Sequence, residues 1–218
     1  MSPLDVIYED NHLLVVNKPA GLLTQPTDSS EESLEVQAKA WIKAKYQKPG
    51  NVFLGVVHRL DKPVSGIVVF AKTSKALSRL NESMRSKELQ KTYLALVENG
   101  PKNEQGSLED YLRHDDHRAH VCPQHHQDAK IARLHYKVLK RKAHISLLEI
   151  ILETGRYHQI RCQCSAAGFP IVNDTKYGAK PAANFTPGEI ALHHSRLSLK
   201  HPVTSSMLSL EAPNVWNE

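Results

Sequence analysis

The order of apolar and polar residues divides the chain into short strand-like runs and helical segments. Near the N-terminus, VIY and LLVVN predict two strands joined by the turn-like residues Glu9-Asp10-Asn11. The segment Lys18-Pro19-Ala20-Gly21 ends the second strand. Further along, VFLGVV before His58 and IVVFA after it predict two buried strands.

Two amphipathic helices are predicted in the first half of the chain. Ser29 with Glu32 resembles a capping box, and Pro49-Gly50 ends the helix that this box opens. The apolar face of this helix consists of Leu34, Ala38, Trp41, Ile42 and Tyr46. The second helix runs from about Ser74 to Gln90, and one side of it carries Leu77, Leu80 and Met84.

The second half of the chain contains mainly strands. TYLALVEN predicts a strand, whereas the polar stretch from Gly100 to Lys130 is predicted to be irregular, with short strands as an alternative for parts of it. HYKVLKRKAHISLLEIILE predicts a hairpin that turns near Arg141-Lys142. Tyr157 to Ala167 predicts a helix, and two or three strands follow up to Leu210.

Strands outnumber helices, and several neighbouring strands are joined by short turns. This pattern predicts an α+β fold with a central mixed, largely antiparallel sheet that is flanked by helices and loops. There is no internal repeat and no linker rich in Ser, Gly or Pro. We therefore expect a single domain over residues 1–218.

Composition excludes several classes of protein. Of the 218 residues, 40% are hydrophobic and 23% are charged, which excludes collagen-like, low-complexity and intrinsically disordered chains. No apolar run approaches the ~18–20 residues that span a membrane, and the first residues do not form a signal peptide. Three cysteines cannot make an even disulfide framework, so we expect a cytoplasmic location.

The charge balance is basic. There are 28 Lys and Arg residues against 23 Asp and Glu residues, which gives a net charge of +5 and a sequence pI near 9.0. This balance permits a polyanionic partner such as nucleic acid without requiring one.

Polar residues are densest in the loop His58-Arg59-Leu60-Asp61-Lys62-Pro63-Val64-Ser65-Gly66, between two apolar strands. Catalytic groups are often mounted on such loops, because the sheet on either side is rigid. The alternative is that Asp61 caps the turn and pairs with Lys62 at the surface. Composition alone does not decide between these interpretations.

A second polar cluster, Glu153-Thr154-Gly155-Arg156-Tyr157-His158-Gln159-Ile160-Arg161, follows the apolar strand LLEIILE. If it begins a helix, Tyr157 and Arg161 are i,i+4 neighbours, and so are His158 and Cys162. An arginine from this cluster could neutralise Asp61 and keep its carboxylate ionised, as a nucleophile or base requires.

Five ordered motifs extend over nearly the whole chain. They are Asn17-Lys18-Pro19-Ala20-Gly21-Leu22; His58-Arg59-Leu60-Asp61 with Ser65-Gly66 and Ala71-Lys72; Lys91-Thr92-Tyr93-Leu94-Ala95; Gly155-Arg156, His158-Gln159-Ile160-Arg161, Gly168, Pro170-Ile171, Asp174 and Tyr177-Gly178; and Leu192-His193 with Ser195-Arg196-Leu197 and His201-Pro202. Together they resemble the motifs of the RluA family of RNA pseudouridine synthases.

The resemblance implies the pseudouridine synthase fold and isomerisation of uridine to pseudouridine in RNA, without a cofactor or a metal. It assigns Asp61 as the catalytic aspartate, acting on the base or at ribose C1′. Tyr93 matches the tyrosine that lies against the uracil ring, and Arg161 matches the arginine that pairs with the aspartate. Without the resemblance, the favoured interpretation of Tyr93 is a core residue of its strand, and Arg161 could be a charge on a helix surface.

The target uridine must leave its stack to reach an aspartate in a cleft. The resemblance assigns Arg59 to RNA engagement at this step. His58 either contacts RNA as well or only satisfies the end of its strand. These two substrate-binding residues complete the candidate site.

Four positions depart from the pattern of the family. Val64 replaces a usual Thr, Gln163 replaces His, His194 replaces a small residue, and Asn173 replaces Gly. None of them belongs to the set Asp61, Tyr93 and Arg161. We therefore expect activity to be kept and substrate choice to differ.

Many relatives carry an RNA-binding module of the S4 type before the first motif, which here begins at Asn17. We therefore expect one catalytic domain over residues 1–218, without an S4 domain, that acts as a monomer. RNA contacts then fall on the catalytic domain itself, including its basic runs Lys39, Lys43, Lys45 and Lys48, and Lys137, Lys140, Arg141 and Lys142. These runs are otherwise ordinary solvated faces.

A histidine-rich segment contains His114, His117, His120, His125 and His126 together with Cys122. Its spacing matches no familiar zinc finger, and Cys162 and Cys164 on a helix would point about 200° apart. We expect no metal here. A partly protonated loop near RNA and plain surface variation are the two alternatives.

Three classes of function are therefore compared. The first is an RNA pseudouridine synthase that acts on a ribosomal or transfer RNA stem-loop, with no membrane and no DNA as partner. The second is an RNA-binding or RNA-folding protein on the same fold. The third is a metal-dependent nucleic-acid hydrolase that uses the histidines. The joint presence of Asp61, Tyr93 and Arg161 favours the first.

Overall fold

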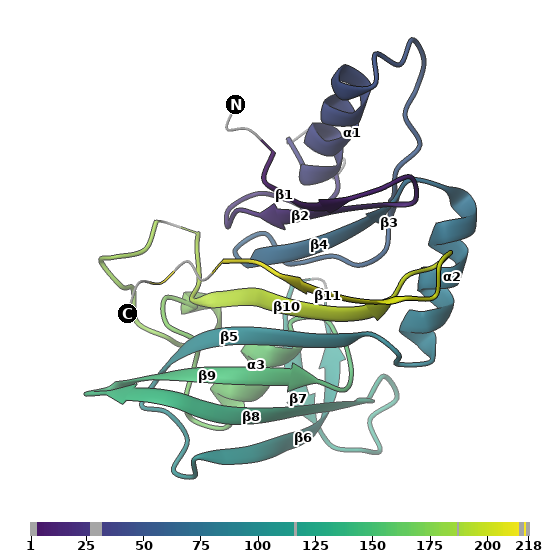
Figure 1. Cartoon of the computed structure of the whole chain (residues 1–218). Coiled ribbons are helices and arrows are strands. Elements are labelled where there is room, and N and C mark those ends of the chain that lie inside the picture. Colours follow the sequence, from purple (N-terminus) through teal and green to yellow (C-terminus); the bar gives the residue numbers. More distant parts are fainter. Residues whose placement is uncertain (1–3, 27–31, 116, 187, 214–215, 217–218) are drawn as a thin grey trace. The chain divides into compact units, whose positions relative to one another are not determined.

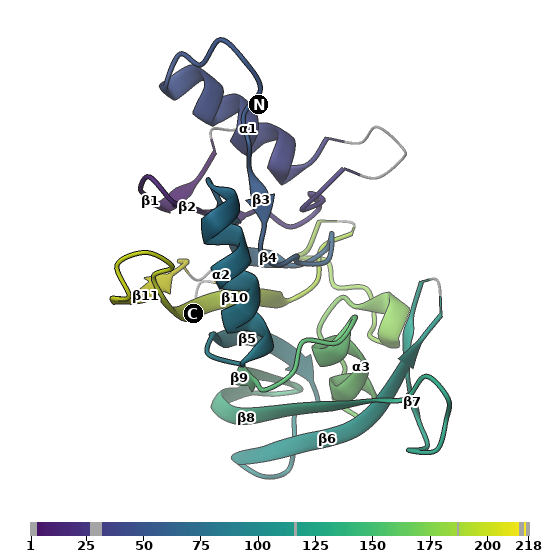
Figure 2. The same ribbon diagram turned by 90° about the vertical axis from the view of Figure 1, so that its right-hand side faces the viewer.

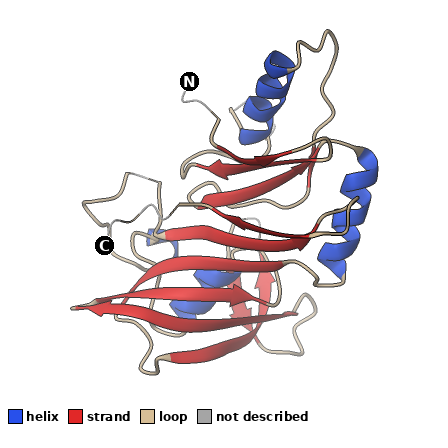
Figure 3. Cartoon of the chain, in the orientation of Figure 1, coloured by secondary structure: helices blue, strands red, loops and turns tan. Residues whose placement is uncertain are grey.

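The computed structural model describes residues 4–26, 32–115, 117–186, 188–213 and 216. The chain forms two compact units. Unit 1 consists of residues 1–89 and 194–218, and unit 2 consists of residues 90–193. Strands form most of the regular structure in each unit, as Figure 3 shows.

Unit 1 is built on a sheet whose strands come from both ends of the chain (Figure 1, purple, blue and yellow). The strands are β1 (Val6–Glu9), β2 (Leu13–Lys18), β3 (Gly55–Val56), β4 (Ser65–Ala71), β10 (Leu192–Lys200) and β11 (Met207–Glu211). Their order is β1-β2-β4-β10, with β11 paired to β10 and β3 paired to β4. The register of β2 on β4 runs from Leu13 opposite Ala71 to Lys18 opposite Gly66.

The core of unit 1 lies between this sheet and helix α2 (Ser74–Arg85), which crosses one face of it (Figure 2). Ala76 and Leu80 of the helix pack with alternate residues of β2 and β4, such as Leu13 and Ile67. All seven residues of β4 are buried, which explains its continuous apolar sequence. Thr73 caps the helix by accepting a hydrogen bond from the Ala76 N–H at 3.2 Å.

Helix α1 (Leu34–Lys45) begins later than the sequence pattern predicts. Its N-cap is Ser33, whose hydroxyl accepts a hydrogen bond from the Val36 N–H at 3.4 Å. Ser29, the predicted cap, lies outside the described residues. The helix ends before Tyr46, which is exposed and therefore does not belong to the buried face formed by Leu34, Ala38 and Ile42. The predicted end of α2 near Gln90 is also wrong, because Gln90 already begins the next strand.

Unit 2 contains five strands that pair antiparallel with one another. They are β5 (Gln90–Glu98), β6 (Gln105–His114), β7 (Ala119–Cys122), β8 (Lys130–Lys142) and β9 (Ile145–Leu152), in the order β5-β9-β8-β6-β7. Helix α3 (Gln159–Ala166) and a short 3-10 helix (Thr175–Tyr177) follow the sheet in sequence. Cys162 and Tyr177 pack with Leu112, Ala119 and Ala132 of the sheet, so α3 lies beside β6 and β7 (Figure 2).

The sequence predicts an irregular stretch from Gly100 to Lys130 that could include short strands. The short strand β7 fits this prediction, whereas the ten-residue strand β6 does not. β6 pairs with β8 from Gln105 opposite Lys137 to Leu112 opposite Lys130. Most side chains of β6 are polar and only Leu112 is fully buried. Backbone pairing rather than apolar periodicity therefore holds this strand, and its hydrophobic signal is correspondingly weak.

Most of the other predicted elements are confirmed, but the predicted buried strand VFLGVV is reduced to the two residues of β3, and Phe53 in this run is exposed. The two N-terminal strands pair antiparallel, and the hairpin of β8 and β9 turns at residues 143–144, directly after Arg141-Lys142. The predicted α+β fold with a largely antiparallel sheet is confirmed, whereas the single domain over residues 1–218 stays a prediction. Among the described residues, every helix is too short or too polar to cross a lipid bilayer.

Candidate active site

The loop between β3 and β4 carries three of the predicted site residues, His58, Arg59 and Asp61. Arg59 is exposed, Asp61 is half-buried, and Leu60 between them is buried. The apolar side chain of Leu60 therefore anchors the loop, while its two charged neighbours stay accessible to a ligand.

Thr24 fixes the backbone on one side of Asp61. Its hydroxyl donates a hydrogen bond to the carbonyl oxygen of Leu60 at 2.9 Å and accepts one from the Leu60 N–H at 3.1 Å. Thr24 is only 3% exposed, so water does not compete for these bonds. Both backbone groups of Leu60 are thus held by one side chain from a distant part of the chain.

Lys18 and Gly21 fix the backbone on the other side of Asp61. The Gly21 N–H donates to the carbonyl oxygen of Lys62 at 2.8 Å, and the Lys18 ammonium donates to the same oxygen at 3.2 Å. The ammonium also donates to the carbonyl oxygens of Pro19 and Leu22. The first motif and the Asp61 loop are therefore joined through Lys62.

Lys18 is a fully buried cation in the neighbourhood of Asp61. Burial lowers the pKa of Lys18 to about 7, and the carboxylate of Asp61 opposes this decrease. A positive charge near a carboxylate stabilises its ionised form, which is the form that a nucleophile requires.

His58 is buried and bound to the sheet. Its Nε2 accepts a hydrogen bond from the Val69 N–H at 3.3 Å, and its ring lies edge-on to that of His194, with 5.5 Å between centroids. His194 Nδ1 in turn donates to the carbonyl oxygen of Ile67 at 2.7 Å. These contacts support the view that His58 satisfies the strand end, while its contact with RNA stays a prediction.

Gly66 allows a close approach of the backbone at the end of the loop. It has φ +114°, and a Cβ at this position would lie 2.4 Å from the carbonyl oxygen of His194. A side chain here would push β4 away from His194. Glycine therefore allows the start of β4 to lie this close to the backbone of His194.

Arg161 and Tyr93 belong to unit 2. Arg161 on α3 is 5% exposed and forms a bidentate ion pair with Asp174, with Nε to Oδ2 at 2.7 Å and Nη2 to Oδ1 at 2.9 Å. Its guanidinium also lies 5.0 Å from the centre of the Tyr177 ring. Arg161 is therefore not a charge on the helix surface. Tyr93 on β5 is buried opposite Ile150 of β9.

The segment before α3 is held by Gln159. Its Oε1 accepts hydrogen bonds from the Thr154 hydroxyl at 2.8 Å and the Arg156 N–H at 3.0 Å, and its Nε2 donates to the Arg133 carbonyl oxygen at 3.0 Å. The helix begins at Gln159, with His158 as N-cap in the left-handed region at φ 49°. The predicted helical neighbours Tyr157 and His158 therefore precede the helix.

The histidine-rich segment forms separate local contacts. His120 Nε2 lies 2.9 Å from Asp115 Oδ2, and the His114 ring contacts Tyr157. Within the described part of the chain, no three His, Cys, Asp or Glu side chains converge as a metal site would require. Burial raises the pKa of Cys162 to about 11 and that of Cys164 to about 12, so both stay protonated thiols.

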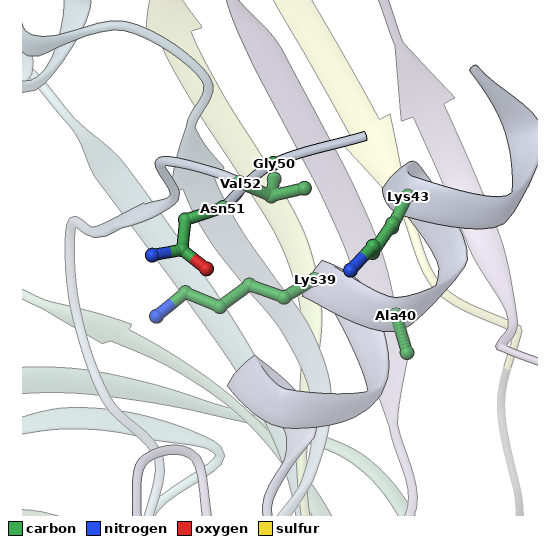
Figure 4. A pocket seen from close by; sticks show the side chains of 6 residues that line it. All are labelled: Lys39, Ala40, Lys43, Gly50, Asn51 and Val52. Carbon is green, nitrogen blue, oxygen red and sulfur yellow. The ribbon is translucent and has the colours of Figure 1, made fainter. Parts of the chain in front are cut away.

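Several of the basic residues predicted to contact RNA are held in ion pairs. Lys45 Nζ lies 2.6 Å from Glu9 Oε2, Lys39 pairs with Glu35, and Arg141 pairs with Glu104. Lys39 and Lys43 line an open hollow of about 370 Å³ together with Gly50, Asn51 and Val52 (Figure 4).

Three of the residues that depart from the family pattern have structural partners. Gln163 Nε2 donates to Asp110 Oδ2 at 2.7 Å, and its buried Oε1 has no hydrogen-bond partner among the described residues. The Asn173 amide donates to the Glu189 carbonyl oxygen at 2.6 Å. Together with the bond from His194 to Ile67, these contacts place the departures in the interior framework.

The five predicted site residues are thus divided into two groups. His58, Arg59 and Asp61 share one loop of unit 1, and Tyr93 and Arg161 lie on β5 and α3 of unit 2. Sequence reasoning missed the supporting residues, which include Lys18, Thr24, Gln159 and Asp174. Lys18, Gln159 and Asp174 lie within the sequence motifs, but the motifs do not show which residues they contact.

Comparison with known proteins gives consistent matches. The profile of a family described as RNA pseudouridylate synthase matches residues 12–166. The chain is 34% identical over 216 residues to the uncharacterized RNA pseudouridine synthase YhcT of Bacillus subtilis, covering 96% of this chain and 68% of that protein. It is 32% identical over 222 residues to ribosomal large subunit pseudouridine synthase D of Yersinia pestis, covering 96% and 67%.

The chain spans about two thirds of the length of such curated relatives. A solved structure of the human protein RNA pseudouridylate synthase domain containing 4 matches with a TM-score of 0.79 and 23% identity, over 96% of this chain and 88% of that one. At this identity the match concerns the fold, and it agrees with the α+β architecture described above.

Proposed function

Because this chain belongs to the family of RNA pseudouridylate synthases, we propose that it isomerises uridine to pseudouridine in structured RNA, with Asp61 as the catalytic residue. The observation that carries this proposal is the support of the Asp61 loop. The backbones of Leu60 and Lys62, on either side of Asp61, are both held by the segment 18–24. A carboxylate supported in this way is positioned for chemistry.

The reaction is an isomerisation and needs no cofactor. The bond between ribose C1′ and uracil N1 breaks, the base turns, and C5 joins C1′, while the proton lost from C5 is balanced by one gained at N1. Attack of Asp61 on the base and attack on C1′ both require the ionised carboxylate. Burial lowers the pKa of Lys18 to about 7, and in its protonated form this side chain favours the ionised carboxylate of Asp61.

Three further residues complete the proposed mechanism. Arg59 engages the RNA when the target uridine leaves its stack, since it is the exposed member of the loop. The resemblance to the family assigns Tyr93 to the uracil ring and Arg161 to the carboxylate of the catalytic aspartate. The bidentate pair with Asp174 fixes the orientation of the Arg161 guanidinium, which favours a positioning function.

Large-subunit ribosomal RNA is the first substrate to test. Several relatives at 32–36% identity carry the name ribosomal large subunit pseudouridine synthase D. Their names concern those proteins, and transfer RNA is the alternative substrate. A map of pseudouridine across all cellular RNAs distinguishes the two.

The decisive experiment compares cells lacking this gene with cells complemented by wild type, Asp61→Asn or Asp128→Asn. Asn keeps the shape of the carboxylate and removes its charge, and Asp128 is an exposed aspartate of unit 2 that serves as the matched control. We expect wild type and Asp128→Asn to restore the lost pseudouridines and Asp61→Asn to restore none. Equal restoration by Asp61→Asn would overturn the assignment of Asp61.

Purified protein tests the chemistry directly. We expect wild type to release tritium from RNA whose uridines are labelled at C5, and Asp61→Asn to release at least 100-fold less. Binding without release by the wild type would instead identify an RNA-binding protein on the same fold.

A further inference from the structure

Tyr157 is an exposed tyrosine whose ring rests on another aromatic side chain. The rings of Tyr157 and His158 are stacked, with 3.9 Å between centroids and 17° between planes. Tyr157 is 42% exposed, whereas His158 beneath it is buried. The proposed mechanism assigns no function to this pair.

His158 is a rigid support because a chain of hydrogen bonds fixes its ring. The Ala119 N–H donates to the Tyr177 hydroxyl at 2.8 Å, so the Tyr177 proton is free to bond to His158 Nδ1, 2.9 Å away. Burial raises the pKa of Tyr177 to about 12, which keeps that proton in place. Burial and the positive charges of Arg161 and Lys176 lower the pKa of His158 to about 3, so the imidazole is neutral.

His114 borders Tyr157 without enclosing it. The His114 ring centre lies 5.4 Å from that of Tyr157, and the two planes are inclined by 52°. An inclined neighbour together with 42% exposure leaves aromatic surface accessible. His114 is the first residue of the histidine-rich segment, which has no function in the proposed reaction.

The neighbourhood of this aromatic group is rich in exposed cations. Arg118 lies over the Tyr177 ring at 4.9 Å, Lys176 donates to the His117 carbonyl oxygen at 2.9 Å, and Arg156 directly precedes Tyr157. The acidic Asp115 is held by the N–H groups of His117 and Arg118 and by His120. A flat aromatic ring among cations is the combination that binds single-stranded nucleic acid.

We propose that Tyr157, supported by His158 and bordered by His114, is a stacking platform for an unpaired base of the RNA substrate. This inference rests on the proposed function and adds a contact surface on unit 2. Because His158 is locked, the tyrosine loses little freedom when a base stacks on it.

Fluorescence anisotropy with a labelled 12-nucleotide oligouridylate tests the platform. Stacking contributes ~1–3 kcal/mol per base, so we expect Tyr157→Leu to weaken binding about 5- to 100-fold. Tyr157→Phe keeps the ring and stays within about twofold of wild type. Thermal unfolding of both variants checks that the fold is kept, which is expected for an exposed side chain.

Tyr46→Leu is the matched control. Tyr46 is 45% exposed, but the ammonium groups of Lys45 and Lys72 lie 5.6 Å and 4.9 Å from its ring centre. We expect this variant to bind as wild type does. Stacking and charge are separated by salt titration: Tyr157→Leu leaves the slope of log K against log salt unchanged, whereas Lys176→Gln lowers its magnitude by about 0.7.

Wild-type affinity of Tyr157→Leu for the oligouridylate would overturn the platform, and so would an equal loss of affinity for a duplex of the same length. Tritium release by the wild type tests the proposed function separately from the platform. Release without an effect of Tyr157→Leu contradicts the platform alone. An effect without release contradicts the isomerase and leaves the platform as an RNA contact.

Discussion

Arg161 shows how the surroundings of a single side chain change its interpretation. Its sequence position suggests a partner for Asp61, yet two of its guanidinium nitrogens already bond to Asp174, which is 1% exposed. Removal of the cation from a buried ion pair strongly destabilises the folded protein, because the carboxylate stays buried without a partner. Substitution of Arg161 therefore acts on folding as well as on chemistry.

We predict that Arg161→Met destabilises the protein by ~3–5 kcal/mol, because the Asp174 carboxylate stays buried without its guanidinium. Urea denaturation measures this loss. The double variant Arg161→Met/Asp174→Leu is expected to recover part of the stability, since no buried charge remains. Under conditions where Arg161→Met is folded, we expect RNA binding to be kept and most turnover to be lost.

Arg161→Lys is the control that keeps the charge but cannot form the bidentate pair. We expect intermediate stability and reduced turnover for it. A fully stable Arg161→Met would show that the ion pair contributes nothing to folding, and full turnover in that variant would exclude a function in catalysis.

Among the structural elements, the Asp61 loop depends on the segment that begins with Lys18, the last residue of β2. Thr24 and Lys18 belong to this segment, and their partners Leu60 and Lys62 lie 36 and 44 residues further along the chain. The two bonds of Thr24 are buried, so removal of its hydroxyl costs the full desolvation penalty of the Leu60 backbone groups. The loop is therefore rigid although it contains no regular structure.

We predict that Thr24→Val, which keeps the shape and removes the hydroxyl, leaves the N–H and C=O of Leu60 without a partner. The expected loss of stability is ~1–3 kcal/mol. We also expect turnover to fall ~10–100-fold with little change in RNA affinity, because Asp61 is displaced rather than removed.

Thr175→Val serves as the matched control, since Thr175 is exposed in the short 3-10 helix of unit 2. We expect this control to show wild-type stability in denaturation and wild-type turnover in single-turnover kinetics. Wild-type kinetics in Thr24→Val would contradict a contribution of the Thr24 hydrogen bonds to catalysis.

At the scale of the whole molecule, charge is not concentrated in one unit. Unit 1 contains 14 of the 28 basic residues and 12 of the 23 acidic ones, and unit 2 contains the remainder. Any electrostatic preference for RNA therefore arises from local groups of cations that lack nearby carboxylates. Net charge alone does not locate the RNA.

We predict that two lysines of the same helix contribute differently to RNA binding. Lys45 is compensated by Glu9 at 2.6 Å, whereas Lys43 lines the open hollow near Asn51. Titration of oligouridylate binding with KCl should show a slope lower by about 0.7 for Lys43→Gln and a slope near wild type for Lys45→Gln. Equal effects of the two variants would show that the ion pair with Glu9 does not survive in the complex.

The sequence by itself determined the family, the Asp61 loop and the elements with strong apolar periodicity. β2, β4, α2 and the hairpin of β8 and β9 all bury such patterns, and a pattern of this kind is local. It did not predict the long strand β6, because backbone pairing rather than apolar side chains holds this strand. It also misplaced the start of α1, where Ser33 rather than Ser29 is the cap.

Only the tertiary structure decided which side chains bond to one another. Four pairs are fixed by contacts between elements or loops: Asp174 with Arg161, Leu60 with Thr24, Lys62 with Lys18, and Tyr177 with His158. Hydrogen bonds and ring contacts act over a few ångströms. Motif spacing along the chain carries no such information until folding brings the partners together.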